Sequence, residues 1–309
     1  MTRHLAIVGP TASGKSAVAL AVAAACADVE IVSLDSMQVY RGMDIGTAKP
    51  TLAERQGVAH HLLDLVEPDA LFSVADFVRA AQPVLADLAA RGGVALLVGG
   101  TGLWLRALAT GLDVDASPAD AELRAKLERE LTTDGVEALA ARLTGEAPLT
   151  AGRTDLRNPR RVVRALEITR LRGDGPPAAA LGYGARVLRL NMTLDPERNR
   201  AWIERRARGQ LSAGLPDEAA RLRLRFGSNL RAFSAIGYQE AFDLLDGRLD
   251  ETGFLAVNVA RNVAFARRQR TWFRSDAFGD EQHEIDAEGD PLRHALEAAR
   301  RFLGDERLS

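Results

Sequence analysis

The chain of 309 residues contains one cysteine, Cys26, which excludes an internal disulfide framework and a multi-cysteine zinc site. Lysine is also scarce, because only Lys15, Lys49 and Lys126 occur among the 40 basic residues. No apolar run approaches the roughly 18 residues that a membrane-spanning helix needs. The first apolar stretch is also too short for a signal peptide. We therefore expect a globular, cytoplasmic protein that has no membrane partner.

The net charge of −2 conceals an uneven distribution of charged residues. Residues 1–150 contain 12 Lys and Arg against 19 Asp and Glu, whereas residues 151–309 contain 28 against 23. A basic C-terminal half suggests a polyanionic partner. Runs of charge also occur on solvated helix faces, so charge alone leaves both interpretations open.

Short apolar segments alternate with helical patterns in the N-terminal part of the chain. We expect strands at residues 4–8, 30–34 and 94–98, and helices at 16–27 and 76–90. This alternation is typical of an α/β protein with a parallel sheet flanked by helices.

A purely helical pattern from about residue 117 to 171 interrupts this alternation, and a strand pattern returns at 186–194. A helical block between strands of one sheet suggests an insertion. We therefore predict a core domain in two parts, residues 1–115 and 185–309, with a helical insertion domain at 116–184.

The first predicted strand runs into a segment that fits the P-loop pattern G-x-x-x-x-G-K-[ST]. In a P-loop, backbone N–H groups surround a phosphate, the lysine neutralises its charge and the final hydroxyl reaches Mg²⁺. The segment also opens a helix, whose N-terminus attracts anions. We predict a di- or triphosphate site, with Mg²⁺ as the cofactor and Ser16 as a metal ligand. Its residues are Gly9, Pro10, Thr11, Ala12, Ser13, Gly14, Lys15 and Ser16.

Two further strand ends carry polar groups. The strand at 94–98 ends in Gly99-Gly-Thr-Gly102, without the metal-binding aspartate that a nucleotide hydrolase usually has there, which favours a transferase over a motor or GTPase. The strand at 30–34 is followed by Asp35, on the sheet edge where α/β proteins bind ligands. This carboxylate is suited to bind a metal or to take a proton from a nucleophile. A helix or turn cap is the alternative.

These segments, taken together, closely resemble the bacterial tRNA dimethylallyltransferases. The resemblance extends in order over nearly the whole chain, and its longest block, Asp35–Pro50, is unusual in sequence. The matching segments are Gly9–Ser16, Asp35–Pro50, His60–Asp64, Ser73–Phe77, Gly99–Gly102, Asn158–Glu167, Ile236–Tyr238 and Arg267–Arg274.

The resemblance implies a prenyl transfer rather than a phosphoryl transfer. Members of the family move a dimethylallyl group from dimethylallyl diphosphate to N6 of the adenine 3′-adjacent to the anticodon in tRNAs, and they release diphosphate. By this resemblance, Lys15 and a magnesium ion at Ser16 stabilise the leaving diphosphate. Asp35 is then the general base on the adenine amine, with Thr101 beside it, so the implied catalytic residues are Asp35, Thr101 and Lys15.

The resemblance also implies contacts with the anticodon stem-loop of tRNA. The residue pattern agrees with it, because Arg160 and Arg164 share one helix face and the arginines at 267–274 interleave with aromatic residues that can stack on unpaired bases. A solvated helix with buried aromatics is the alternative. The implied tRNA-binding residues are Asp35, Ser36, Met37, Gln38, Thr101, Arg124, Arg160, Arg161, Arg164, Gly237, Tyr238, Arg267, Arg268, Gln269, Trp272 and Arg274.

The chain departs from the family pattern at Trp202, where an arginine is usual, and at Asn262–Phe265, where Thr-Arg-Arg-Tyr is common. The alternative function is a small-molecule or nucleotide kinase, since kinases share the P-loop and an acid on the next strand. An RNA-binding protein without enzymatic activity is a third hypothesis. We interpret His60 and His61 as structural loop residues rather than a metal pair, and we expect a monomer.

Overall fold

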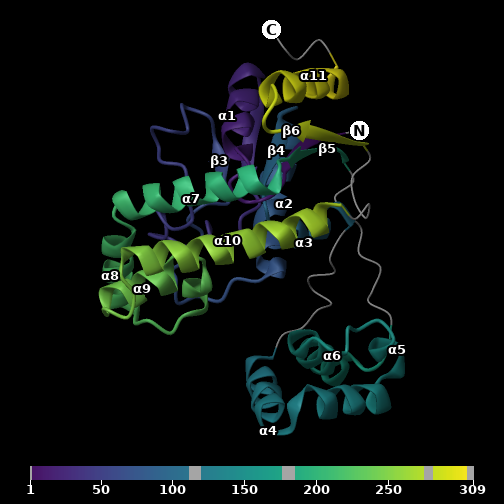
Figure 1. Ribbon diagram of the computed structural model, residues 1–309. Helices are drawn as coiled ribbons and strands as arrows, with labels where there is room; N and C mark the ends of the chain where they lie inside the picture. The colour runs from purple at the N-terminus through teal and green to yellow at the C-terminus, as the bar shows by residue number, and fades with distance from the viewer. Residues whose placement is uncertain (1, 111–119, 176–184, 275–280, 305–309) are drawn as a thin grey trace. The chain divides into compact units, whose positions relative to one another are not determined.

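The computed structural model describes residues 2–110, 120–175, 185–274 and 281–304 (Figure 1). The chain divides into two compact units, one made of Met1–Thr110 and Gly182–Ser309 and the other of Gly111–Leu181. The insertion domain predicted at 116–184 overlaps the second unit, and both of its predicted boundaries lie outside the described residues.

A parallel sheet in the order β3-β2-β4-β1-β5-β6 forms the centre of the first unit. The predicted α/β fold with a parallel sheet flanked by helices is therefore confirmed. The described strands are β1 (Arg3–Val8), β2 (Val29–Ser33), β3 (His60–His61), β4 (Val94–Gly99), β5 (Arg186–Thr193) and β6 (Glu281–Asp286).

The two edge strands were not predicted. β3 consists of His60 and His61, which were expected in a loop, and it pairs with Ile31 and Val32 of β2. β6 pairs with β5 but has the polar sequence Glu-Gln-His-Glu-Ile-Asp, with its one apolar side chain buried. Edge strands commonly carry charged residues that discourage further pairing, so neither segment shows the apolar run that marks a central strand.

Helices cover both faces of the sheet. α1 (Lys15–Ala25) and α11 (Pro291–Leu303) lie next to each other and share one apolar core with β1, β4 and β5 (Figure 1). α2 (Val74–Ala90) packs on β4 and α3 (Gly102–Thr110) packs on α2. Phe77 of α2 stacks on Trp104 of α3 with ring centroids 4.1 Å apart.

Four helices and a 3₁₀ turn follow the carboxyl end of β5. They are α7 (Pro196–Ser212), α8 (Leu215–Phe226), η1 (Arg231–Ser234), α9 (Tyr238–Leu245) and α10 (Glu251–Phe273). α10 runs along α7, while α8 packs against α9 (Figure 1). Aspartates cap α7 and α10, because the carboxylates of Asp195 and Asp250 accept backbone N–H groups of the first turns.

The second unit is helical, with α4 (Ala121–Glu146), α5 (Pro148–Ala151) and α6 (Pro159–Arg172) around a core of leucine, valine and alanine. Gly135 has φ +82° and ψ 168° and breaks α4 into two segments, because glycine tolerates a backbone conformation that other residues avoid. Both segments lie within the helical pattern expected from about residue 117 to 171.

Candidate functional site

The order of the central strands places three loops side by side at the carboxyl edge of the sheet. β4 lies between β2 and β1, so the loops that follow these strands emerge as neighbours. Backbone hydrogen bonds join two of them, since the Leu34 N–H donates to Val98 O at 2.7 Å and the Thr101 N–H donates to Leu34 O at 3.1 Å. The Ser36 N–H donates to Thr101 Oγ1 at 3.2 Å. Asp35 and Thr101 are thereby brought together as the sequence predicted.

The P-loop connects β1 to α1, and its conformation depends on glycine. Gly9 has φ +149°, and a Cβ at this position would lie 2.8 Å from the carbonyl oxygen of Met192. Gly14 has φ +80° and immediately precedes α1. Lys15 folds back over the loop and donates from Nζ to Pro10 O at 3.0 Å. The loop therefore presents its backbone and the N-terminus of α1 to the same space, as an anion site requires.

Side chains of α7 and α10 hold the P-loop in place. Gln269 accepts the Thr11 N–H at 2.7 Å and donates to Gly100 O at 3.1 Å. Asn199 donates to Thr11 O at 2.9 Å and accepts from Arg270 at 3.0 Å. Gln269 was predicted to contact tRNA. It is buried and its amide is occupied by the protein, so its place in this structure is a brace between two loops of the site.

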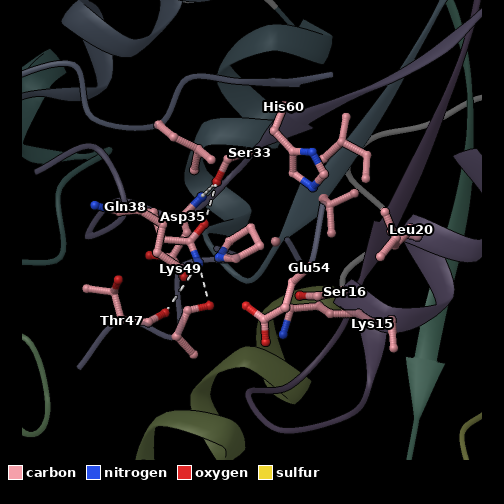
Figure 2. A pocket seen from close by; sticks show the side chains of 18 of the residues that line it. Lys15, Ser16, Leu20, Ser33, Asp35, Gln38, Thr47, Lys49, Glu54 and His60 are labelled. Carbon is pink, nitrogen blue, oxygen red and sulfur yellow. Dashed lines mark hydrogen bonds between the residues drawn. The ribbon is translucent and has the colours of Figure 1, made fainter. Parts of the chain in front are cut away.

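A cavity of about 470 Å³ opens at the P-loop. Figure 2 shows Lys15 and Ser16 on one side of it, and Asp35, Gln38 and Thr47 on the other. Apolar side chains of α1, β2 and β4 also line it, as do Lys49, Glu54 and His60. The cavity thus joins the phosphate-binding loop to the carboxylate that the sequence singled out.

A second cavity, of about 430 Å³, lies on the side of α10. It is lined by Ser36, Met37 and Thr101, and by Arg268 and Gln269 of α10, all predicted to contact tRNA. The lining that the two cavities have in common consists of Thr11, Asp35, Thr47 and Arg206. Asp35 therefore stands where the two cavities meet.

Two cations face this junction. The pKa of Lys15 is lowered to about 8, mainly by burial and also by the positive charge of Arg206, while Asp35 opposes the shift. Burial also lowers the pKa of Arg206, which Asp35 again opposes. Two partly desolvated cations next to one carboxylate favour an anion with more than one negative charge. Arg206 was not among the predicted site residues, because it follows the departure from the family pattern at Trp202.

The predicted Mg²⁺ site was tested against the donors present. Among the described residues, no group of three or more His, Cys, Asp and Glu could hold a metal ion. A P-loop does not need such a group, since Mg²⁺ is shared there between one hydroxyl, phosphate oxygens and water. Ser16 is exposed in the first turn of α1 and lines the P-loop cavity, so the donors present fit a metal ion that enters together with a phosphate ligand.

His60 and His61 make contacts that support a structural role. The His60 ring Nδ1 lies 2.9 Å from Val58 O, and His61 Nε2 lies 2.6 Å from a carboxylate oxygen of Glu30. Each ring is thus engaged by a neighbouring group of the fold rather than by its histidine partner.

The block Asp35–Pro50 is held together by the buried Lys49. Lys49 donates to Tyr40 O at 2.8 Å and pairs with Asp44 and Asp64, each at 2.6 Å. Gln38 donates to Thr47 O at 3.2 Å. The unusual sequence of this block therefore encodes a specific loop structure in addition to the residues that line the cavities.

Glu218 of α8 is a buried acceptor that the sequence analysis missed. It accepts the N–H groups of Asp44, Ile45 and Gly46 at 3.1, 2.8 and 3.2 Å, and the Tyr238 hydroxyl at 2.6 Å. Tyr238 is fully buried, so its side chain serves the fold in this structure, and its predicted contact with tRNA stays a prediction. A lone acid in the first turn of a helix gives no sequence signal for such a role, since acids are common there.

Gly237, the other residue predicted to bind tRNA from this segment, has φ +112° and precedes α9. Its N–H donates to Glu240 at 2.9 Å. Its neighbours Ala235 and Ile236 line the second cavity. The segment is thus at the site, while Gly237 itself serves the turn that leads into α9.

The predicted tRNA-binding arginines near the end of α10 are exposed, whereas the aromatic residues there are buried or half-buried. Arg267, Arg268 and Arg274 are exposed, whereas Phe273 is buried. Trp272 is half-buried and occupies the space in which a Cβ of Gly102 would lie. The indole therefore packs against α3, so stacking on a base is not the role that this structure gives it.

Arginines of the second unit fall into two groups. Arg124 and Arg164 pair with the fully buried Glu167 at 2.8 and 2.7 Å. Although burial alone would oppose ionisation, hydrogen bonds from Arg164 and Arg124 hold the pKa of Glu167 below its ordinary value. Arg160 and Arg161 are exposed instead. Arg164 therefore neutralises a buried acid whereas Arg160 is exposed, and the predicted contacts of both with tRNA stay predictions.

Trp202, one of the departures from the family pattern, lies on α7 beside the P-loop, within 3.8 Å of the position that a Cβ of Gly14 would take.

Nowhere in the described part of the chain is there a helix with the length and apolar character needed to span a membrane.

The parallel sheet, the P-loop at the end of β1 and the cationic junction define a P-loop protein whose site is suited to a phosphorylated ligand. A family model described as IPP transferase matches residues 38–276, and one described as isopentenyl transferase matches residues 2–71. The chain belongs to the IPP transferase family, which confirms the resemblance seen in its sequence.

Individual relatives agree with this assignment. A tRNA dimethylallyltransferase of Anaeromyxobacter dehalogenans (strain 2CP-C) is 45% identical over 280 residues, which cover 89% of this chain and 92% of the relative. The structure of the full-length tRNA isopentenylpyrophosphate transferase from Bacillus halodurans is similar, with a TM-score of 0.70 at 35% identity, covering 98% of this chain and 97% of that one. A eukaryotic dimethylallyltransferase acting on tRNA shares the fold, with a TM-score of 0.83 at 23% identity over 99% of this chain and 82% of that one.

Proposed function

We propose that this protein transfers a dimethylallyl group from dimethylallyl diphosphate to N6 of the adenine 3′-adjacent to the anticodon in tRNAs, releasing diphosphate. Membership of the IPP transferase family supports dimethylallyl transfer to tRNA as the class of reaction. The observation that carries the proposal is the pair of cavities that share Asp35 and Arg206. The cavity at the P-loop suits a diphosphate, and the second cavity is the place that we assign to the target adenine.

The diphosphate is held by the P-loop backbone, Lys15 and Arg206. The bond between C1 of the dimethylallyl group and the bridging oxygen breaks, and its electron pair leaves with the diphosphate. The two cations and the N-terminus of α1 stabilise the charge that develops on this leaving group. A magnesium ion at Ser16 supplies further charge neutralisation when it is bound. Because these groups are placed before the reaction begins, little reorganisation is needed as the charge forms.

Asp35 takes the proton from the amine as the new bond between N6 and C1 forms. The exocyclic amine of adenine is a weak nucleophile, since its lone pair is delocalised into the ring. The Asp35 carboxylate is oriented by the Met37 N–H, which donates to Oδ1 at 2.9 Å. Thr101 lines the second cavity and accepts the Ser36 N–H, so it fixes the loop that carries Asp35, the proposed general base.

Phosphate contacts with tRNA come from exposed arginines. Arg267, Arg268 and Arg274 on α10, and Arg160 and Arg161 on α6, are the exposed members of the predicted set. The target adenine reaches the second cavity after leaving the stack of the anticodon loop, as bases do in other enzymes that modify them. A tRNA substrate supports action in the cytoplasm, and the monomeric state stays a prediction.

The test is a transfer assay with the purified chain, radiolabelled dimethylallyl diphosphate and an anticodon stem-loop. We expect label to enter the RNA, with release of diphosphate that depends on the RNA. A stem-loop with guanine in place of the target adenine serves as the control and should stay unlabelled. Phosphorylation of a small molecule or nucleotide by ATP, without transfer of the label, would instead establish the kinase hypothesis.

A further inference from the structure

Asn262 on α10 is buried, with 5% of its surface exposed, and it contacts one of the two cations at the junction. Its Oδ1 accepts a hydrogen bond from Arg206 Nη2 at 2.8 Å. It stands in the segment Asn262–Phe265 where the sequence departs from the family pattern. Asn262 also lines the second cavity but not the P-loop cavity, so it reaches the diphosphate site only through Arg206.

The orientation of the Asn262 amide follows from its partners. Its Nδ2 donates to Asn258 O at 3.1 Å and to Asn258 Oδ1 at 2.8 Å. A backbone carbonyl accepts and a guanidinium donates, so the amide nitrogen must face Asn258 and the oxygen must face Arg206. Asn258 is itself buried, with 1% exposed. The three side chains therefore form a chain of hydrogen bonds that ends at the guanidinium.

A long arginine side chain needs such a support. Arginine carries about 2 kcal/mol of rotamer entropy, which must be lost when the guanidinium is held in one place. Free rotation would let Arg206 turn towards Asp35 and neutralise the proposed general base. A neutral acceptor such as the Asn262 amide holds the guanidinium without cancelling its charge, whereas a carboxylate would satisfy it and weaken its attraction for an anion.

We propose that Asn262 is a positioning residue, which holds the guanidinium of Arg206 towards the P-loop cavity and thereby sets the affinity for the diphosphate group. This inference rests on the proposed function, because it takes the P-loop cavity to be the diphosphate site. Asn262 has no contact with the diphosphate in this arrangement. Its effect is exerted through Arg206 alone.

The test measures binding of inorganic pyrophosphate with Mg²⁺ by calorimetry, together with steady-state transfer. Asn262→Leu removes the acceptor while keeping similar volume. We expect the pyrophosphate Kd and the KM for dimethylallyl diphosphate to rise about tenfold, the size of one lost hydrogen bond to a charged group. Affinity for tRNA, which rests on phosphate contacts, should change less than about twofold. Asn262→Thr retains an oxygen acceptor on a shorter side chain and should recover part of the loss.

A double-mutant cycle with Arg206→Met isolates the connection. If Asn262 acts through Arg206, adding Asn262→Leu to Arg206→Met causes no further loss of pyrophosphate affinity. Losses that multiply in the double variant would overturn the inference. An Asn262→Leu variant that binds pyrophosphate as the wild type does would also overturn it. So would a variant that loses only tRNA affinity, since the amide would then serve the binding of the target adenine.

Two further results separate the possible failures. Thermal unfolding of each variant shows whether it is folded, and Asn262→Thr provides the same comparison if the leucine variant does not fold. If wild-type protein fails to bind pyrophosphate, the proposed diphosphate site is wrong. If it binds pyrophosphate and Lys15→Ala abolishes that binding, the site stands, and an unaffected Asn262→Leu or Asn262→Thr variant refutes the positioning role alone.

Discussion

Replacing Asp35 by asparagine tests the central chemical step. Asparagine has the same shape, and its side-chain oxygen can still accept the Met37 N–H that Asp35 Oδ1 accepts at 2.9 Å. The loop should therefore keep its structure. The substituted amide cannot take a proton from the adenine amine, so the variant separates proton transfer from the geometry of the site.

The expected loss of turnover is about 10²–10⁴-fold, which is what a positioned general base contributes, and it corresponds to about 2.7–5.5 kcal/mol in the barrier. Binding of diphosphate should move the other way. Asp35 raises the pKa of both Lys15 and Arg206, which means that its negative charge is felt at both cations. Removing that charge leaves the cations uncompensated, so pyrophosphate should bind as tightly as in the wild type or tighter.

The assay is single-turnover transfer at saturating substrates, alongside calorimetric binding of pyrophosphate and a filter-binding measurement for tRNA. Asp69→Asn is the matched control, because Asp69 is an exposed aspartate that lines neither cavity. The reasoning is refuted if Asp35→Asn loses pyrophosphate binding while its chemical step survives. Asp35 would then be a binding or metal-linked residue rather than the base.

Three other changes have expected outcomes. Lys15→Ala should abolish transfer and leave tRNA binding within a few-fold, because it removes a cation from the diphosphate site alone. Replacing Arg160 and Arg161 with alanine should weaken tRNA binding and reduce the slope of its salt dependence, since fewer counterions are released. The buried His4 has a pKa lowered to about 4 by burial, so the free energy of unfolding should fall by about 3 kcal/mol as pH drops from about 6.5 to 4, where only the unfolded chain is protonated.

Each of these outcomes has a control. Near wild-type transfer by Lys15→Ala at saturating dimethylallyl diphosphate would show that Lys15 is not part of the diphosphate site. If the slope of the salt dependence is unchanged, Arg160 and Arg161 belong to a solvated helix face and do not bind tRNA. The control variant is Arg129→Ala, on the exposed surface of α4. His4 Nδ1 accepts the Ala95 N–H at 3.1 Å, so His4→Asn keeps an acceptor and should flatten the pH dependence of unfolding. If the pH dependence of unfolding persists in His4→Asn, it arises from other titratable groups.

The sequence predicted those parts of the molecule whose signals are local. The central strands show as apolar runs, and the P-loop shows as a spaced motif that opens a helix. The helical character of α4 shows in the purely helical pattern from about residue 117 to 171. The edge strands β3 and β6 were missed, since a polar segment pairs there with a strand formed by distant residues, and nothing within the segment itself marks the pairing.

The site was predicted where a motif coincides with a strand end, and missed where a lone side chain reaches it from another helix. Asp35 and Thr101 follow β2 and β4, so the sheet places them. Arg206, Asn262 and Glu218 come from helices whose packing is fixed only in the folded chain. A motif also fails to tell which way a side chain points. Tyr238 and Gln269 both stand in predicted tRNA-binding segments, yet their polar groups are used inside the protein.

The same P-loop core can serve phosphoryl transfer or prenyl transfer, and the surroundings of the phosphate decide between them. A phosphoryl transferase needs a nucleophile near the terminal phosphorus. Here the carboxylate lies at the junction with a second cavity, and β4 ends in Gly99-Gly100-Thr101 instead of an acid. A diphosphate bound at the P-loop would direct its organic substituent towards that junction. In the proposed reaction the acceptor then attacks carbon, and the phosphates leave together as one group held by Lys15 and Arg206.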